Sequence, residues 1–217
     1  MFLGHFGVAF AAKRAAPSAS LGMLVLAAQF ADLLWPLLLL AGVERVHIEQ
    51  GATPLLNLQF TDYPYSHSLL TQASLGVLLG GLYRAIGGTR HAALVVGLLV
   101  PLHWFLDWVV HVPDLPLYPG EVSRHGLGIW QSLAATLVLE LLVYGAGIVV
   151  YMRATRPRDA IGRWSFVAFA AFLLLAYAAS LLGPPPPSVP VLAWSALAIW
   201  LVPVWTYWFD RHRRVVR

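Results

Sequence analysis

The chain has 217 residues, of which 59% are hydrophobic and only 11% charged, with a formal net charge of +4. A soluble domain of this size cannot bury so much apolar surface, so the composition excludes an ordinary globular protein and predicts an integral membrane protein. The absence of cysteine excludes disulfides and thiolate chemistry, which leaves nitrogen and oxygen atoms to hold any metal.

The first apolar segment, residues 2–12, is too short to cross a bilayer, because a spanning helix needs about 20 residues. It is also unlike a secretory signal, since Lys13 and Arg14 follow the apolar run instead of preceding it. We expect a short N-terminal helix that lies at the membrane interface or re-enters the membrane.

Six later stretches are long and apolar enough to span a membrane. They cover residues 21–41, 66–82, 91–110, 127–151, 164–182 and 191–209. The proline-rich run 184–187 predicts a stiff turn between the last two. No domain boundary or internal repeat is evident, so residues 1–217 are expected to form a single all-α domain, a polytopic bundle of about six transmembrane helices.

Positive charge is distributed unevenly between the two ends of these segments. One side carries Lys13, Arg14, Arg84, Arg90, Arg153, Arg156, Arg158, Arg163, Arg211, Arg213, Arg214 and Arg217. The other side carries mostly acidic residues, with only Arg45 and Arg124 among them. The positive-inside rule therefore predicts a multi-pass protein of the inner membrane with both termini cytoplasmic. This placement explains the net charge without a nucleic-acid partner.

Six ionisable residues fall within or beside the apolar segments, where each costs several kcal/mol unless it is paired, hydrated or bound to an ion. They are His5, Asp32, His67, His103, Asp107 and Glu140. Counting about 1.5 Å per residue from the basic ends places all six roughly 12 to 25 Å deep. Residues from separate segments thus share one layer, which predicts a common site opening toward the external face.

The third span has the sharpest local pattern. His103, Asp107 and His111 are spaced i, i+4 and i+8, which places them on one helix face. An imidazole and a carboxylate one turn apart can hold the same cation, although an interhelical hydrogen-bonded pair is the alternative. At the depth of Asp32 the sequence offers histidines but no lysine or arginine, which favours a metal or a His–Asp pair over a salt bridge.

The second span begins with a serine-rich segment. Ser66 is expected to be the helix N-cap, with His67 in the first turn. Free backbone N–H groups there would favour an anion such as phosphate. The alternative is a capped helix with an interfacial histidine.

Four short motifs together resemble a known family. They are Leu3-Gly4-His5-Phe6, Ala31-Asp32, Tyr65-Ser66-His67-Ser68-Leu69-Leu70 and His103-x-x-x-Asp107. They resemble the predicted membrane-bound metal-dependent hydrolases, also described as inner-membrane-associated hydrolases, over roughly the first half of the chain. The order of histidines and aspartates is also similar to the ligand order of the zinc-dependent phospholipase C and single-strand nuclease group.

The resemblance implies that His5, Asp32, His67, His103 and Asp107 are metal ligands. The soluble enzymes have a later His-x-x-x-Glu that this chain lacks, and His111 and Glu140 are candidates to replace it. Ser66 and Ser68 are further candidates for accessory or substrate-binding roles. Zn²⁺ is favoured by the ligand types, with Mn²⁺ as the second choice.

The sequence as a whole favours metal-assisted hydrolysis of a phosphoester in a membrane lipid or similar small molecule, with Asp32 bridging ions or acting as a base. The loops 42–64 and 113–119 are expected to shape substrate access. A proton- or ion-coupled transporter is the main alternative, because buried Asp, Glu and His also form relays. A scaffold whose polar residues only hold helices together is a third.

Overall fold

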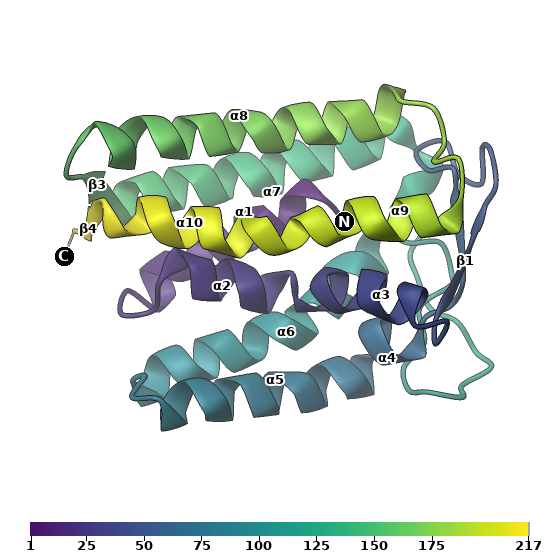
Figure 1. The fold of residues 1–217 in the computed structure, drawn as a ribbon, viewed down its shortest axis with the longest axis horizontal. Helices are drawn as coiled ribbons and strands as arrows, with labels where there is room; N and C mark the ends of the chain where they lie inside the picture. The colour runs from purple at the N-terminus through teal and green to yellow at the C-terminus, as the bar shows by residue number, and fades with distance from the viewer. Residues whose placement is uncertain (217) are drawn as a thin grey trace.

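A computed structural model describes residues 1–216, and its helices run along one long axis (Figure 1). The helices are α1 (Leu3–Ala15), α2 (Leu21–Ala28), α3 (Phe30–Leu40), α4 (Pro64–His67), α5 (Leu69–Ala85), α6 (Arg90–Val110), α7 (Leu133–Ala154), α8 (Ala160–Leu182), α9 (Val189–Ala196) and α10 (Leu201–Arg211). Single 3₁₀ turns, η1 (Ile129–Gln131) and η2 (Leu197–Trp200), precede α7 and α10.

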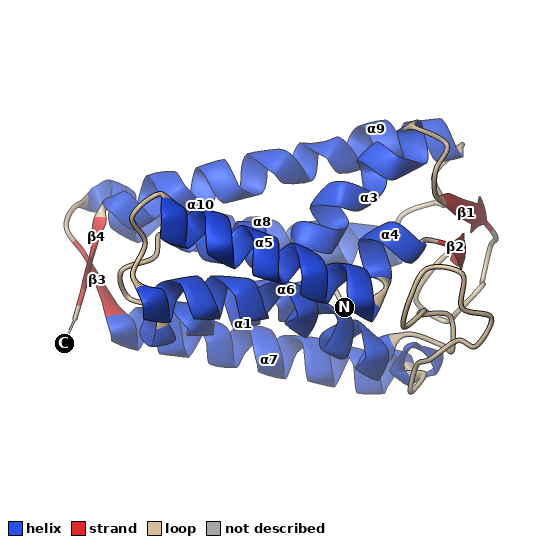
Figure 2. Cartoon of the chain, turned by 90° about the horizontal axis from the view of Figure 1, so that it is seen from below, coloured by secondary structure: helices blue, strands red, loops and turns tan. Residues whose placement is uncertain are grey.

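Two short two-stranded antiparallel sheets mark the ends of the bundle (Figure 2). Strand β1 (Arg45–Ile48) pairs with β2 (Leu58–Asp62), and β3 (Thr155–Pro157) pairs with β4 (Arg213–Val215). We call these the β1–β2 end and the β3–β4 end. The sheets are small additions to the expected helical architecture.

Four helical runs are long and apolar enough to cross a membrane. They are α6, α7, α8 and the continuous run Val189–Arg211 that joins α9, η2 and α10. The pair α2–α3 makes a fifth if the two are counted together. The mostly helical architecture is confirmed and these helices fit a membrane protein, but six spans are not confirmed, because α5 has only 17 residues.

The expected helix over residues 21–41 is broken rather than continuous. Gln29 leaves helical geometry, with φ −103° and ψ 12°, and the axes of α2 and α3 differ by 56°. Pro36 lies inside α3 and does not cause this break. The break frees the Ala28 carbonyl at the end of α2 and places Asp32 in the first turn of α3.

The N-terminal helix lies inside the bundle. Most residues of α1 are buried, and it packs mainly against α7 and α2. A Cβ on Gly7 of α1 would clash with the Val143 and Tyr144 backbone of α7, and a Cβ on Gly147 of α7 would clash with the Gly7 backbone. This close approach holds the start of α1 deep in the molecule, where Figure 1 marks the N-terminus.

The prediction that Ser66 caps the second span is wrong. Ser66 and His67 belong to the separate one-turn helix α4, and Ser68 is the N-cap of α5. The Ser68 hydroxyl accepts from Thr71 N at 3.3 Å. Because Ser68 is extended, the chain turns between α4 and α5, and this turn directs His67 inward.

Candidate metal centre

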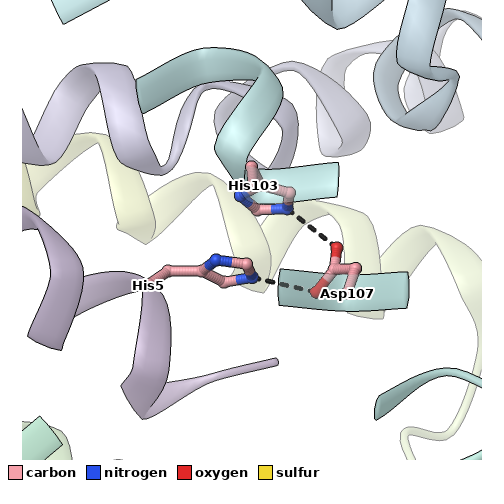
Figure 3. A group of neighbouring side chains, drawn as sticks. All are labelled: His5, His103 and Asp107. Carbon is pink, nitrogen blue, oxygen red and sulfur yellow. Dashed lines mark hydrogen bonds and ion pairs between the residues drawn. The ribbon is translucent and has the colours of Figure 1, made fainter. Parts of the chain in front are cut away.

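Helices α1, α3, α4 and α6 bring five of the expected site residues together. The nitrogen and carboxylate oxygen atoms form two groups, each within 4.8 Å: one holds His5, His103 and Asp107, and the other holds Asp32, His67 and His103. Figure 3 shows the first group, with His5 from α1 facing two residues of α6. Either group has the donor types and spacing to hold a metal ion.

Asp107 is the centre of the cluster. Its Oδ1 lies 3.0 Å from His5 Nε2, and its Oδ2 lies 3.0 Å from His103 Nε2. Nε2 of His67 and of His111 each lie 3.9 Å from one of its oxygens. Asp107 and the four histidines around it are all buried, so these groups face one another in a site of low dielectric.

The tautomer of His103 follows from its neighbours. Its Nδ1 lies 2.8 Å from the Ala28 carbonyl, which can only accept, so Nδ1 carries the proton and donates. In the neutral ring the lone pair is then on Nε2. Among residues 1–216 this buried Nε2 forms no hydrogen bond, although a carboxylate oxygen lies nearby.

His67 is oriented in the same way. The Ser66 hydroxyl donates its one proton to Glu44 Oε2 at 2.6 Å, so it must accept from His67 Nδ1 at 2.7 Å. The lone pair of His67 therefore lies on Nε2, which is 3.6 Å from Asp32 Oδ1. Glu44 also accepts from the Ser66 backbone N–H at 2.8 Å, which fixes α4 in place.

His111, just beyond α6, repeats the arrangement. Its Nδ1 donates to Asp114 Oδ1 at 2.8 Å, and Tyr63 donates to the same oxygen at 2.7 Å. Burial, followed by the nearby Asp114 charge, raises the pKa of Tyr63, so the phenol stays protonated and remains a donor. His111 thus also directs Nε2 toward Asp107, at 3.9 Å.

These contacts fit a bound cation. Three imidazoles have Nδ1 tied to an oxygen acceptor and Nε2 directed at carboxylates, which is how metal-ligating histidines are usually held. The Met1 amino group already pairs with Asp107 Oδ1, but without a further cation the lone pairs of His67 Nε2 and His103 Nε2 would still face carboxylate oxygens in a buried site. Protonating all the rings would not resolve this, because His5 and His103 stack with centroids only 3.7 Å apart and two positive charges there would repel each other. Because His103 has one free lone pair, it can serve only one of the two groups at a time.

Asp32 differs from the other members of the cluster. Its side chain is 33% exposed, against 2% for Asp107. It lines a cavity of 460 Å³ that also reaches His67 and Asp107. Asp32 is therefore the cluster carboxylate that a substrate or water molecule can reach.

Two accessory candidates have structural partners. The Glu140 carboxylate accepts from the backbone N–H groups of Phe2 and Gly4, at 2.7 and 2.8 Å, and so caps the start of α1. The Ser68 hydroxyl donates to Thr71 Oγ1 at 2.8 Å within α5. Glu140 therefore positions the helix that carries His5, and Ser68 shapes the turn after His67.

The sequence analysis missed three residues that support the histidines: Glu44, Tyr63 and Asp114. Asp114 stands three residues after His111, so its spacing was a usable signal. Glu44 and Tyr63 are distant in sequence from the side chains they hold, and no pattern indicated them.

The expected access loops lie at the β1–β2 end beside the cluster. A second cavity of 470 Å³ there is lined by polar residues of these loops, including Asp114 and Arg124. Phe60 and Trp130 line both cavities and stand between them, with ring centroids 6.3 Å apart.

Comparison of the chain with known protein families, curated proteins and solved structures finds no match. The description of this site therefore rests on its own geometry.

Proposed function

We propose that the protein is a membrane-embedded metal-dependent hydrolase that cleaves a phosphoester in a lipid-like substrate. One observation carries the proposal: His67, His103 and His111 each have Nδ1 held by an acceptor and Nε2 turned toward Asp107 or Asp32. A network that only stabilises helices has no need to leave the buried Nε2 of His103 without a hydrogen bond.

The residues of the cluster would have different roles, some as metal ligands and one as a base. His103 would hold the ion either with His5 and Asp107 or with His67 and Asp32. A bound divalent ion would supply Lewis acidity at the phosphoryl group and lower the pKa of water. Asp32, facing the cavity, would accept the proton from the attacking water. The backing oxygens on Nδ1 would keep the rings from turning.

Ligand chemistry supports Zn²⁺ as the ion, with Mn²⁺ second, because imidazole nitrogen and carboxylate oxygen suit both. The resemblance to membrane-bound metal-dependent hydrolases agrees with this assignment. We further propose that the protein lies in the inner membrane with the β1–β2 end external, since most basic residues lie toward the opposite end.

Metal content by elemental mass spectrometry on detergent-purified protein tests the proposal. We expect about one Zn²⁺ or Mn²⁺ per chain, and none in a folded His103→Ala/Asp107→Ala variant. The matched control is His91→Ala, which removes an exposed histidine whose Nε2 is hydrogen-bonded to the Ala15 carbonyl, and it should keep the metal. Release of phosphate or head group from phospholipids would then be measured on the metal-loaded protein.

A metal-replete preparation without stoichiometric metal would overturn the hydrolase. Ion flux in proteoliposomes, lost in Asp107→Asn, would then indicate a transporter. A protein that tolerates Asp107→Asn in both assays would be a scaffold.

A further inference from the structure

The cavity that Asp32 lines is enclosed by two helical walls. It lies between α8 on one side and the α9–η2 run on the other, with Asp32, His67 and Asp107 at its base. Near the β3–β4 end α8 packs against α10, whereas α9 packs against α3 and β1. The two walls therefore separate toward the β1–β2 end, and the space between them is the cavity.

The cavity walls are apolar. They consist largely of side chains such as Phe6, Phe172, Leu173, Ala176 and Val202. The rim residues Ala198 and Ser195 are exposed on the side of the bundle, within helices that are long and apolar enough to span a membrane. A ligand could therefore enter sideways from the hydrocarbon region without crossing water. The volume of 460 Å³ is within the range of about 300–1,000 Å³ that is usual for small-molecule sites.

Two polar groups in the cavity lack partners. Gln29 Oε1 and the Tyr177 hydroxyl are buried and have no hydrogen-bond partner in the part of the chain that the structure describes. The two residues are 2% and 6% exposed, and both line the cavity. Buried polar groups are almost always hydrogen-bonded, so two unpaired ones on the same cavity point to a ligand with oxygen atoms near the cluster.

We propose that this cavity binds the hydrocarbon chain of an anionic lipid, with the phosphate at the His/Asp cluster, the Tyr177 hydroxyl donating to an oxygen next to it and Gln29 Oε1 accepting from a hydroxyl of the same ligand. The position of the phosphate rests on the function proposed above, whereas the chain site rests on the cavity alone. The occupant must be apolar along its length and polar at one end, because only the base of the cavity carries charged side chains. A lipid chain meets both requirements, and a water-soluble phosphoester meets only the second.

Photolabelling in lipid nanodiscs tests the chain site. The probe is a dodecyl phosphonate with a diazirine at the end of its chain, which cannot be hydrolysed. We expect labelling within residues 172–181 and 195–202. Filling the cavity with Ala176→Trp should reduce labelling there by about tenfold, because overpacking a formed site is strongly unfavourable. Leu175→Trp is the matched control, since Leu175 is 70% exposed on the same helix, and its labelling should be unchanged.

A second variant and a competition experiment distinguish loss of the binding site from misfolding. Ala198→Trp narrows the cavity from the opposite wall and should also reduce labelling. Unlabelled dodecyl phosphonate should compete, and methylphosphonate at the same concentration should not. Equal labelling of wild type and both cavity variants, or label spread evenly over all helices, would overturn the inference.

The two proposals can fail separately. A protein that holds no metal but labels in the cavity would keep the chain site and lose the hydrolase. A protein that holds metal and hydrolyses lipid but does not label there would lose only the chain site. Metal content of Ala176→Trp should equal that of wild type.

Discussion

The molecule buries two groups of charged side chains, and they are built on different rules. Toward the β3–β4 end, Asp210 on α10 accepts from Lys13 at 2.8 Å, from Leu21 N at 2.9 Å and from the Tyr151 hydroxyl at 2.8 Å. Lys13 also donates to the Ala19 carbonyl at 2.7 Å. Opposite charges cancel, and both carboxylate oxygens have partners. This network ties α1, α2, α7 and α10 together.

The His/Asp cluster is the opposite case. It gathers two aspartates with four histidines, the Met1 amino group pairs only with Asp107, and buried ring nitrogens of His5 and His103 have no partners among the described residues. It also opens on a cavity, through Asp32. The comparison teaches that intramembrane charge alone does not identify a site. A network in which every charged group has a partner holds helices together. A network that opens on a cavity and leaves nitrogen atoms unpaired is arranged to bind a ligand.

The largest expected effect breaks the closed network. Asp210→Ala would leave the Lys13 ammonium buried without a counter-charge, which should destabilise the fold by about 3–5 kcal/mol. Thermal unfolding in detergent would measure this. Metal per folded chain should not change. A Lys13→Met/Asp210→Leu variant removes both charges and should recover most of the loss, and if it does not, the network contributes more than charge pairing.

A smaller effect is expected from the support of the open cluster. Glu44→Gln weakens the acceptor that orients Ser66 and so His67, and should lower metal affinity by about 10- to 100-fold, as for other residues that back metal ligands. Titration with a competing chelator would measure the affinity. Glu49→Gln, an exposed glutamate at the other end of β1, is the control. Unchanged affinity in Glu44→Gln would exclude His67 from the metal site.

The Tyr63→Phe change should be milder still. It removes one of two donors to Asp114 while the bond from His111 remains, at a cost of about 1 kcal/mol in unfolding free energy. Calorimetry with and without metal would show whether the loss grows when metal is bound. A larger loss with metal would place His111 in the metal site, and an equal loss would leave it structural.

The smallest effect concerns an exposed pair at the β3–β4 end. The Gly162 N–H, followed by His212, lowers the pKa of Asp159, which caps α8. A carboxyl group whose pKa is lowered by folding stabilises the fold at pH values above its pKa in the unfolded chain, about 4. This contribution is lost as the pH falls through its pKa in the folded protein. Wild type and Asp159→Asn should therefore differ near neutral pH and converge in acid. A difference that persists at about pH 2 would contradict this assignment.

The sequence by itself determined the membrane class of the protein and the convergence of its polar residues. Long apolar runs favour membrane spans, and buried ionisable side chains at one depth are stabilised when they contact one another. The i, i+4 spacing of His103 and Asp107 was likewise sufficient to place them on one face.

Only the tertiary structure decided how the cluster is held. The break at Gln29 frees a carbonyl for His103, the turn at Ser68 directs His67 inward, and Glu44 and Asp114 anchor histidines from loops. Local propensity could not reveal these features, because each depends on segments that approach one another only after the helices pack. Short-range periodicity fixes which face of a helix a residue occupies. The residue that contacts it across that face is set by the packing of segments that are distant in sequence.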